Sequence, residues 1–142
     1  MADPIPSTSA TMAIAASALQ AQQARMRVIA ENLANADSTA TTPGGDPYRR
    51  QVPVFTPTPV AGGGEGVSLT RVAADQSAFR TEYAPGHPGA DAKGYLKLPN
   101  VDPLVEALDM QEAQRAYQAS LNVISTANTM NSLTLGLLKQ IP

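Results

Sequence analysis

The chain has no cysteine, no tryptophan and a single histidine in 142 residues. Without cysteine it forms no disulfide and no thiolate metal site, and one histidine is a poor basis for a metal centre or for nucleophilic catalysis. Charged residues make up only 15% of the chain, against about 25% in an average globular domain. The formal net charge of -2 argues against nucleic acid as a partner. The composition favours a protein without enzymatic activity and without a cofactor.

Glycine and proline, which interrupt helices, are concentrated in the middle of the chain. Of the 10 glycines and 12 prolines, all but four lie between Pro43 and Pro103. This distribution predicts an N-terminal arm and helix at 1–42, a middle segment with short strands at 43–100, and a second helix at 101–142. We expect a mainly α fold with a small β element, in which the two long helices pack as an antiparallel coiled coil.

Large apolar residues recur every seven positions in the first part, at Ile5, Met12, Leu19, Met26 and Leu33. This is the spacing of a helix that lies along a partner. Alanine, leucine, glutamine and arginine, which are all good helix formers, fill much of the intervening sequence. A helix is therefore predicted over 8–36, preceded by an extended arm.

The last part shows a matching apolar stripe with steps of three and four residues, which is typical of one face of a helix. Its members are Met110, Ala113, Tyr117, Leu121, Ile124, Asn128, Asn131, Leu135 and Leu138. Asp102 followed by Pro103 predicts the start of this helix, because aspartate is a good N-cap and proline needs no N–H partner in the first turn. The acidic residues of the first turns suit the positive end of the helix dipole.

Both predicted helices carry very few charges. Residues 113–138 contain one charged side chain in 26 positions, and residues 7–36 contain three in 30. A helix exposed to water normally has a charged face, so uncharged helices of this kind favour burial on several sides. The middle segment is too short to surround them, and the sequence therefore predicts that other subunits do so. The alternative is a two-helix hairpin whose polar face merely lacks charge.

Short strands are predicted in the middle segment at 49–55, 67–73 and 78–83, the last of which would pair with either of the others. Three prolines within or just after the first strand, Pro53, Pro57 and Pro59, should confine it to a sheet edge or shorten it. The glycine-rich run at 62–66 predicts an exposed, mobile hairpin tip. Because no Lys-Ser/Thr pair comes after it, a phosphate-binding loop is not indicated.

No segment predicts membrane insertion or a cleaved leader. Residues 116–138 are uncharged, but ten of these 23 positions are Gln, Ser, Asn or Thr, which does not fit a helix in hydrocarbon. Asp3 precedes the first basic residue, Arg25, so the basic region of a secretory signal is missing.

Two further features have ordinary interpretations. His87 is followed by Asp91, but the surrounding prolines and glycines exclude the helix that would align the pair on a metal, and a role in a turn or an interface is favoured. The pair Arg49 and Arg50 is too small for a nucleic-acid patch and predicts a strand-end or subunit contact.

Five segments occur in a characteristic succession, beginning with an Asn-x-x-Asn motif formed by Asn32 and Asn35. They are 28–38 (VIAENLANADS), 42–50 (TPGGDPYRR), 87–95 (HPGADAKGY), 99–102 (PNVD) and 109–117 (DMQEAQRAY). Together they resemble the flagellar basal-body rod family, which belongs to the rod and hook group of bacterial flagellar axial proteins. One small departure is Ser120, which stands where the family pattern leads us to expect asparagine.

The resemblance implies a structural subunit of the proximal rod, the periplasmic drive shaft that transmits torque, exported by the flagellar type III apparatus without leader cleavage. The terminal helices would form an inner coiled-coil layer around the export channel, in contact with copies of the chain and other rod proteins. The predicted subunit interface consists of Met12, Leu19, Met26, Asn32, Leu33, Asn35, Met110, Tyr117, Leu121, Ile124, Leu135 and Leu138.

Two other classes of protein stay open at this point. A non-enzymatic helical-hairpin binding module, such as an export adaptor, would form a stoichiometric complex with one partner. An enzyme that uses His87 and Asp91 is the least favoured interpretation, because no further catalytic group can be placed beside them.

Overall fold

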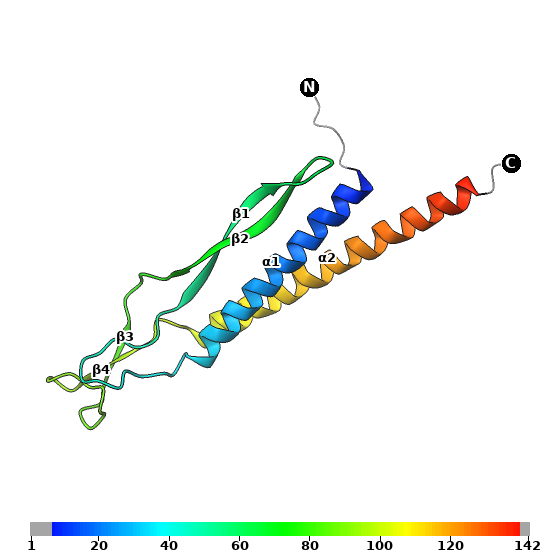
Figure 1. Ribbon diagram of the computed structural model, residues 1–142. Helices are drawn as coiled ribbons and strands as arrows, with labels where there is room; N and C mark the ends of the chain where they lie inside the picture. The colour runs from blue at the N-terminus through cyan, green and yellow to red at the C-terminus, as the bar shows by residue number, and fades with distance from the viewer. Residues whose placement is uncertain (1–6, 140–142) are drawn as a thin grey trace.

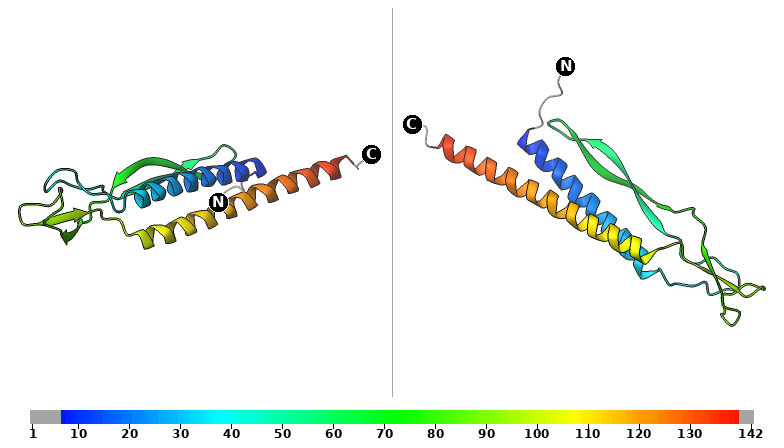
Figure 2. Two further views of the ribbon diagram at one scale, coloured as in Figure 1. Left: turned by 90° about the horizontal axis from the view of Figure 1, so that it is seen from below. Right: turned by 180° about the vertical axis from the view of Figure 1, so that it is seen from behind.

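A computed structural model of the chain describes residues 7–139, so that Ile5 and the predicted arm lie outside the described residues. Two helices lie side by side and run in opposite directions, and a long β-hairpin lies along the first of them (Figure 1). Figure 2 shows the same arrangement from below and from behind. A smaller hairpin lies beyond the helix pair, past the end of the first helix. The expected mainly α fold with a small β element is confirmed.

Helix α1 spans Thr8–Ala34. Ser7 is its N-cap, and the Ser7 Oγ accepts a hydrogen bond from the Ala10 N–H at 3.2 Å, as is typical of serine in this position. The helix begins at the predicted residue but ends two residues earlier than predicted. Asn35 takes the C-cap position. Its backbone N–H and its Nδ2 both donate to the Glu31 carbonyl, at 3.2 Å and 2.8 Å, which holds the cap residue against the last turn.

Helix α2 spans Pro103–Leu138. Asp102 is its N-cap, and one carboxylate oxygen accepts from the N–H groups of Leu104 at 2.9 Å and Val105 at 3.4 Å. The predicted start at Asp102 and Pro103 is therefore confirmed. The helix has 36 residues, against 27 in α1, and its C-terminal end extends beyond the start of α1 (Figure 1).

Very little of α2 is covered by the rest of the chain. Its buried residues are Glu106, Ala113 and Ala127, and Ser120 between them is half-buried. These four positions are seven residues apart, which is the period of a helix face in continuous contact with another helix. Small side chains dominate this contact seam, so the two helices approach each other closely.

The apolar stripe predicted from the sequence leaves this seam in the second half of the helix. Tyr117 and Ile124 are half-buried, but Leu121, Leu135 and Leu138 are 36%, 60% and 61% exposed. Leu121 is exposed because Ser120 and Ala127, rather than their larger neighbours, occupy the contact with α1, whereas Leu135 and Leu138 lie in the last turns of α2, whose C-terminal end extends beyond the start of α1. The large apolar side chains are left on the flank of α2, free to contact other molecules.

Strands β1 (Gln51–Pro59) and β2 (Glu65–Ala74) form an antiparallel hairpin. Its turn is the predicted glycine run, in which Gly62, Gly63 and Gly64 have φ angles of 95°, 99° and 88°. Such positive angles are easily adopted only by glycine. The predicted hairpin tip is confirmed at Gly62–Gly64, whereas Glu65 and Gly66, which were predicted to belong to the exposed tip, are the first residues of β2, and Gly66 is buried.

Strand β1 lies at a sheet edge, as its prolines predicted, but it is not shortened by them and continues to Pro59. The hairpin is fixed to α1 where the Val67 N–H donates to the Ser17 Oγ at 3.0 Å. Gly66 is buried at this contact, and a Cβ added there would lie 2.7 Å from the Ser17 Oγ. The absence of a side chain at Gly66 thus allows the hairpin to lie directly on the helix.

Strand β3 (Arg80–Tyr83) pairs antiparallel with β4 (Tyr95–Leu98). The sequence-based pairing of this region with one of the first two strands is wrong, because the partner is a four-residue strand that was not predicted. Tyr83 and Tyr95 lie opposite each other, and their rings meet edge to face with centroids 5.4 Å apart. A cross-strand aromatic pair of this kind stabilises an otherwise short hairpin.

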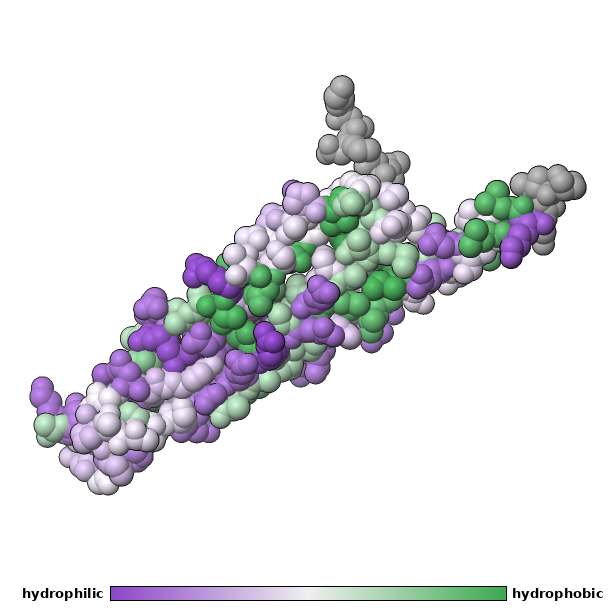
Figure 3. All heavy atoms as spheres, viewed as in Figure 1, coloured by the Kyte–Doolittle hydropathy of each residue, from purple (hydrophilic) through white to green (hydrophobic). Residues whose placement is uncertain are grey.

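Hydrophobic side chains gather over the middle of the helical part and near the free end of α2, whereas hydrophilic residues are more frequent toward the β3–β4 end (Figure 3). None of the helices within residues 7–139 has the length and apolar character that crossing a membrane requires.

Candidate functional site

Asn32 lies near the end of α1 and is 1% exposed. Its Oδ1 accepts hydrogen bonds from the Gln51 N–H at 2.8 Å and the Tyr48 hydroxyl at 2.9 Å. Its Nδ2 donates to the Gln51 carbonyl at 2.9 Å and to the Glu106 carboxylate at 3.1 Å. Because a side-chain amide offers two N–H groups and two lone pairs, all of its hydrogen-bonding positions are filled. Asn32 joins α1 to the first residue of β1 and to the start of α2.

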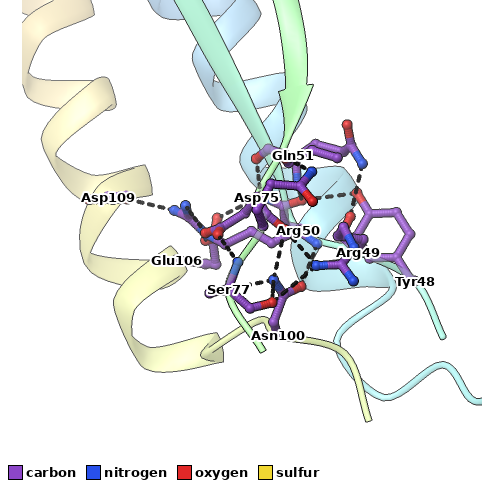
Figure 4. A network of polar contacts seen from close by, with 12 residues as sticks. Tyr48, Arg49, Arg50, Gln51, Asp75, Ser77, Asn100, Glu106 and Asp109 are labelled. Atoms are coloured by element: carbon purple, nitrogen blue, oxygen red, sulfur yellow. Dashed lines mark hydrogen bonds and ion pairs between the residues drawn. The ribbon is translucent and has the colours of Figure 1, made fainter. Parts of the chain in front are cut away.

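Glu106, which accepts the hydrogen bond from Asn32, forms an ion pair with Arg50 (Figure 4). The Arg50 Nε lies 2.5 Å from the Glu106 Oε1, and the Glu106 side chain is only 1% exposed. The same guanidinium lies 3.5 Å from an Asp75 oxygen and 3.6 Å from an Asp109 oxygen. One arginine from the start of the hairpin thus neutralises carboxylates from α2 and from the chain after β2.

Hydrogen bonds and neighbouring charges shift the pKa values of Arg50 and Asp75. Partial burial by itself would lower the pKa of Arg50, but the hydrogen bond and charge of Glu106, with the charges of Asp75 and Asp109, outweigh it and raise that pKa. The pKa of Asp75 is lowered, chiefly by hydrogen bonds from the backbone and hydroxyl of Ser77 and further by Arg50. The raised pKa of Arg50 and the lowered pKa of Asp75 both favour the charged forms of these two side chains.

Asn100 joins the chain before α2 to both ends of the long hairpin. Its Oδ1 accepts from the Arg50 N–H at 2.8 Å, and its Nδ2 donates to the Ser77 Oγ at 2.9 Å and to the Asp75 carbonyl at 3.2 Å. Arg49 reinforces the same turn, since its Nη1 donates to the Asp75 carbonyl at 2.9 Å. The predicted strand-end role of the two arginines is confirmed.

We refer to this cluster as the polar node, and it consists of Asn32, Tyr48, Arg50, Gln51, Asp75, Asn100, Glu106 and Asp109. Its members come from the end of α1, the start of β1, the end of β2 and the start of α2. The buried polar atoms are paired with one another, which is the arrangement of a rigid joint rather than of a reactive centre. In the part of the chain that the structure describes, no three His, Asp or Glu side chains come together as a metal site.

His87 and Asp91 have separate partners. The His87 Nδ1 accepts from the Gly89 N–H at 3.0 Å, and the Asp91 Oδ1 accepts from the N–H groups of Lys93 at 2.8 Å and Tyr95 at 2.9 Å. The hydrogen bond from Tyr95, together with weaker contributions from Lys93 and Gly94, lowers the pKa of Asp91. The two side chains stabilise successive turns of the connection between β3 and β4, in agreement with the predicted turn role of His87.

The structure divides the predicted interface residues of the first helix into two groups. Met12, Leu19, Met26 and Leu33 are half-buried and retain surface that another chain can contact. Asn32 is enclosed in the polar node, so its side chain serves the interior of the subunit. Asn35 caps α1. The predicted residues of α2 remain accessible, with Met110, Tyr117 and Ile124 half-buried and Leu121, Leu135 and Leu138 exposed.

The sequence did not reveal the polar node. The acidic residues in the first turns of α2, which include Glu106, were interpreted only as partners of the helix dipole, and the link between Arg50 and Asp75 was missed. One signal was available: Glu106 lies seven residues before Ala113 and therefore on the contact face of α2. A carboxylate at such a position requires a cation nearby, and Arg50 in the motif that precedes β1 provides it.

Both terminal parts of the chain match families of flagellar rod proteins. The family described as "Flagella basal body rod protein" matches residues 12–40, which contain most of α1 and the Asn-x-x-Asn motif. The family described as "Flagellar basal body rod FlgEFG protein C-terminal" matches residues 92–137, from the loop before β4 almost to the end of α2. The two elements that form the helix pair are therefore those that the rod proteins share.

Full-length relatives extend this likeness over most of the chain. The chain is 44% identical to the flagellar basal-body rod protein FlgC of Agrobacterium fabrum, over 92% of this chain and 95% of the relative. It is 46% identical to FlgC of Escherichia coli O6:H1, over 87% of this chain and 93% of the relative. With FlgC of Bacillus subtilis the identity is 35%, over 82% and 89%. The chain belongs to the FlgC family of flagellar basal-body rod proteins.

Proposed function

We propose that the chain is a structural, non-enzymatic subunit of the bacterial flagellar basal-body rod. This role is supported by relatives that are named as rod proteins and that match this chain along nearly their whole length. The observation that carries it is the apolar surface of α2, where Leu104, Leu108, Met130, Leu133 and Leu137 are 57% to 70% exposed. An exposed apolar surface of this kind is typical of a protein–protein contact.

The proposal includes a finer architecture. The two helices pack as an antiparallel coiled coil and belong to an inner layer around the export channel, in the proximal rod of the periplasmic drive shaft. The parts at 1–42 and 101–142 form this inner layer, and the part at 43–100 lies outside it or between subunits. The seven-residue period of the α2 contact seam supports the coiled coil. Export by the flagellar type III apparatus completes the proposal.

The predicted interface is proposed to bind copies of the chain and neighbouring rod proteins. Its central residues are Leu121 and Ile124 on the exposed flank of α2, with Leu135 and Leu138 toward the free end. On α1, the half-buried Met12, Leu19, Met26 and Leu33 contribute their outer surfaces. Apolar contacts of this type, with few charges to desolvate, allow close packing and a stiff shaft that transmits torque.

The test is to replace Leu121 by aspartate in a strain that lacks the native gene. The charge would be buried in the assembled rod without a partner, so Leu121→Asp should abolish both motility and the presence of the chain in purified basal bodies. Ala92→Asp, which adds the same charge on an exposed loop, should leave both unchanged. Normal motility and incorporation of Leu121→Asp would contradict the proposed interface, whereas absence of the unmodified chain from basal bodies would contradict the function itself.

The helical-hairpin binding module is not favoured, because the relatives are named as rod proteins rather than as adaptors. The two roles differ in where the chain should be found. A rod subunit should be recovered in basal bodies after export, whereas an adaptor should stay in a soluble complex with one partner.

A further inference from the structure

Helix α2 carries a separate surface on each side of its contact seam with α1. Ser120 and Ala127 lie on this seam, and an α-helix turns by about 100° per residue because it has 3.6 residues per turn. Val123 and Met130, each three residues after a seam residue, therefore lie about 60° to one side of the seam. Leu121, one residue after Ser120, lies about 100° to the other side. The two surfaces point in nearly opposite directions and cannot meet within one chain.

The first surface is a groove of about 480 Å³ between the start of α1 and α2. Thr8 and Thr11 of α1 form one wall, and Val123, Thr126 and Met130 of α2 line the other. Val123 and Met130 are 44% and 58% exposed, and Thr126 is also exposed. Their spacing of three and four residues is that of the side chains with which one helix packs as knobs onto another. We call these three residues of α2 the knob flank.

The second surface is an open hollow of about 580 Å³ on the other side of α2. Four residues at positions i, i+3, i+4 and i+7 of a helix surround the hole that accepts a knob from a facing helix. The hollow contains two overlapping sets of this kind, residues 121, 124, 125 and 128 and residues 125, 128, 129 and 132. We call them together the hole flank, and it consists of Leu121, Ile124, Ser125, Asn128, Thr129 and Ser132.

The two flanks match in spacing, height and charge. Thr126 and Met130 are four residues apart and so are the two holes, which makes both distances about 6 Å along the helix axis. Both flanks lie within residues 121–132 of one helix and therefore at the same height. Neither contains a charged residue, so that their burial desolvates no ion. A second copy that lies parallel to the first, with little shift along the axis, brings one flank onto the other.

We propose that the knob flank of one copy packs into the hole flank of a second copy, with the two α2 helices parallel. Met130 enters the hole at residues 125–132, and Thr126 enters the hole at residues 121–128. Leu121 of the second copy in turn fills the groove beside Thr11 of the first. Because the contact joins two different surfaces, its repetition adds copies side by side instead of closing a pair. This inference rests on the proposed role as a rod subunit and specifies how neighbouring copies meet.

The test is disulfide cross-linking in basal bodies, which is specific because the chain has no native cysteine. A strain that lacks the native gene produces the chain with Met130→Cys and Asn128→Cys, and its purified basal bodies are oxidised. The two cysteines point to opposite sides of one helix and cannot be joined within a chain. Covalent multimers longer than dimers are expected on non-reducing gels, and each single-cysteine variant should give monomers only.

The matched control combines Met130→Cys with Ala119→Cys. Ala119 is exposed and lies one residue before Ser120, so that it is on the same side of the contact seam as Met130. Because two knob flanks do not meet in the proposed contact, this control should give monomers only.

The outcomes separate this inference from the proposed function. If the variant with Met130→Cys and Asn128→Cys is incorporated into basal bodies but gives no multimers, the two flanks meet other rod proteins, and the proposed contact is wrong while the rod role stands. Dimers from a single-cysteine variant, or as many multimers from the Ala119→Cys control, would also overturn it. If the unmodified chain is absent from basal bodies, the proposed function fails first.

A pair of charges tests the same contact without cross-linking. Met130→Glu buries a lone charge in the assembled contact, so motility and incorporation into basal bodies should be lost. The isolated chain should melt nearly as before, because Met130 is 58% exposed. Adding Asn128→Lys should restore motility and incorporation, since the lysine of one copy meets the glutamate of the next.

This rescue has to act between copies, because residues two positions apart on a helix do not face each other. Its control is Met130→Glu with Ala119→Lys, which adds the same positive charge on the side of the knob flank and should restore neither property. Normal motility of Met130→Glu alone, or no rescue by Asn128→Lys, would overturn the pairing of the two flanks.

Discussion

Replacing Arg50 by methionine tests the polar node most directly. Methionine keeps much of the apolar stem but removes the guanidinium, so that Glu106, whose side chain is 1% exposed, retains only the Asn32 N–H. Breaking a buried ion pair from one side costs about 3–5 kcal/mol. Because the Arg50 side chain is itself 23% exposed, water can reach part of the vacated space, and we expect a loss of about 3 kcal/mol. That is a large fraction of the stability of a typical domain.

The double variant Arg50→Met/Glu106→Met should be more stable than Arg50→Met alone. Replacing both members by apolar side chains removes the buried charge, and the remaining cost is the unpaired Asn32 N–H, about 1–3 kcal/mol. Asp75 and Asp109 also lose Arg50, but their side chains are 28% and 33% exposed and can be hydrated. The double variant therefore tests whether the buried charge, rather than lost packing, causes the effect.

The assay is urea unfolding of the purified chain, followed by circular dichroism at 222 nm, together with thermal melting. Arg50→Met should lower the melting temperature by about 10 °C. The control is Lys97→Met, which breaks the exposed pair of Lys97 and Asp46 and should leave the unfolding curve unchanged. The reasoning is refuted if Arg50→Met unfolds like the unmodified chain, or if the double variant is destabilised by the sum of the two single changes.

Two further perturbations address other members of the node. Asn32→Asp keeps the size of the side chain but turns a carboxylate oxygen toward the Gln51 carbonyl and the Glu106 carboxylate. Thermal melting should therefore show a loss of at least about 3 kcal/mol in the free energy of unfolding. An unchanged melting temperature would contradict the assigned orientation of the Asn32 amide. Hydrogen bonds from Ser77 are the main cause that lowers the folded-state pKa of Asp75 below its ordinary value of 3.8. The ionised Asp75 therefore stabilises the fold above about pH 4, and this stabilisation is lost as the pH falls through the lower folded-state pKa. Urea midpoints between pH 2 and 5 should therefore depend less on pH in Asp75→Asn, and an identical pH dependence would argue against this shift.

The helices were predictable because their start signals and their composition agree. Serine before Thr8 and the Asp102–Pro103 pair are local features, and few prolines or glycines interrupt the residues after them. The end of α1 was less certain, since Asn35 and Ala36 fit either a last helical turn or a loop. The capping hydrogen bond from Asn35 to Glu31 decides the boundary and depends on a side-chain orientation that the sequence does not specify.

The polar node was not predictable in the same way, because it joins residues far apart in the chain. Asn32 and Glu106 are 74 residues apart, and both also have ordinary local explanations. Strand β4 was missed for a related reason. Four residues are too few to show an alternating pattern, and the strand is positioned by the loop before it, where Asp91 accepts hydrogen bonds from Lys93 and Tyr95.

The prolines of β1 have a consequence for what the hairpin can recruit. Pro53, Pro57 and Pro59 lie an even number of residues after Gln51 in β1, so their backbones face the same side of the strand as that of Gln51. None of the three prolines has an N–H that could bind an incoming chain. The Gln51 N–H and carbonyl are both occupied by the amide of Asn32. The β1 edge of the sheet therefore offers few free donors, which protects this edge against the addition of another strand. Copies of the chain at high local concentration can then associate through their helices without pairing along this edge.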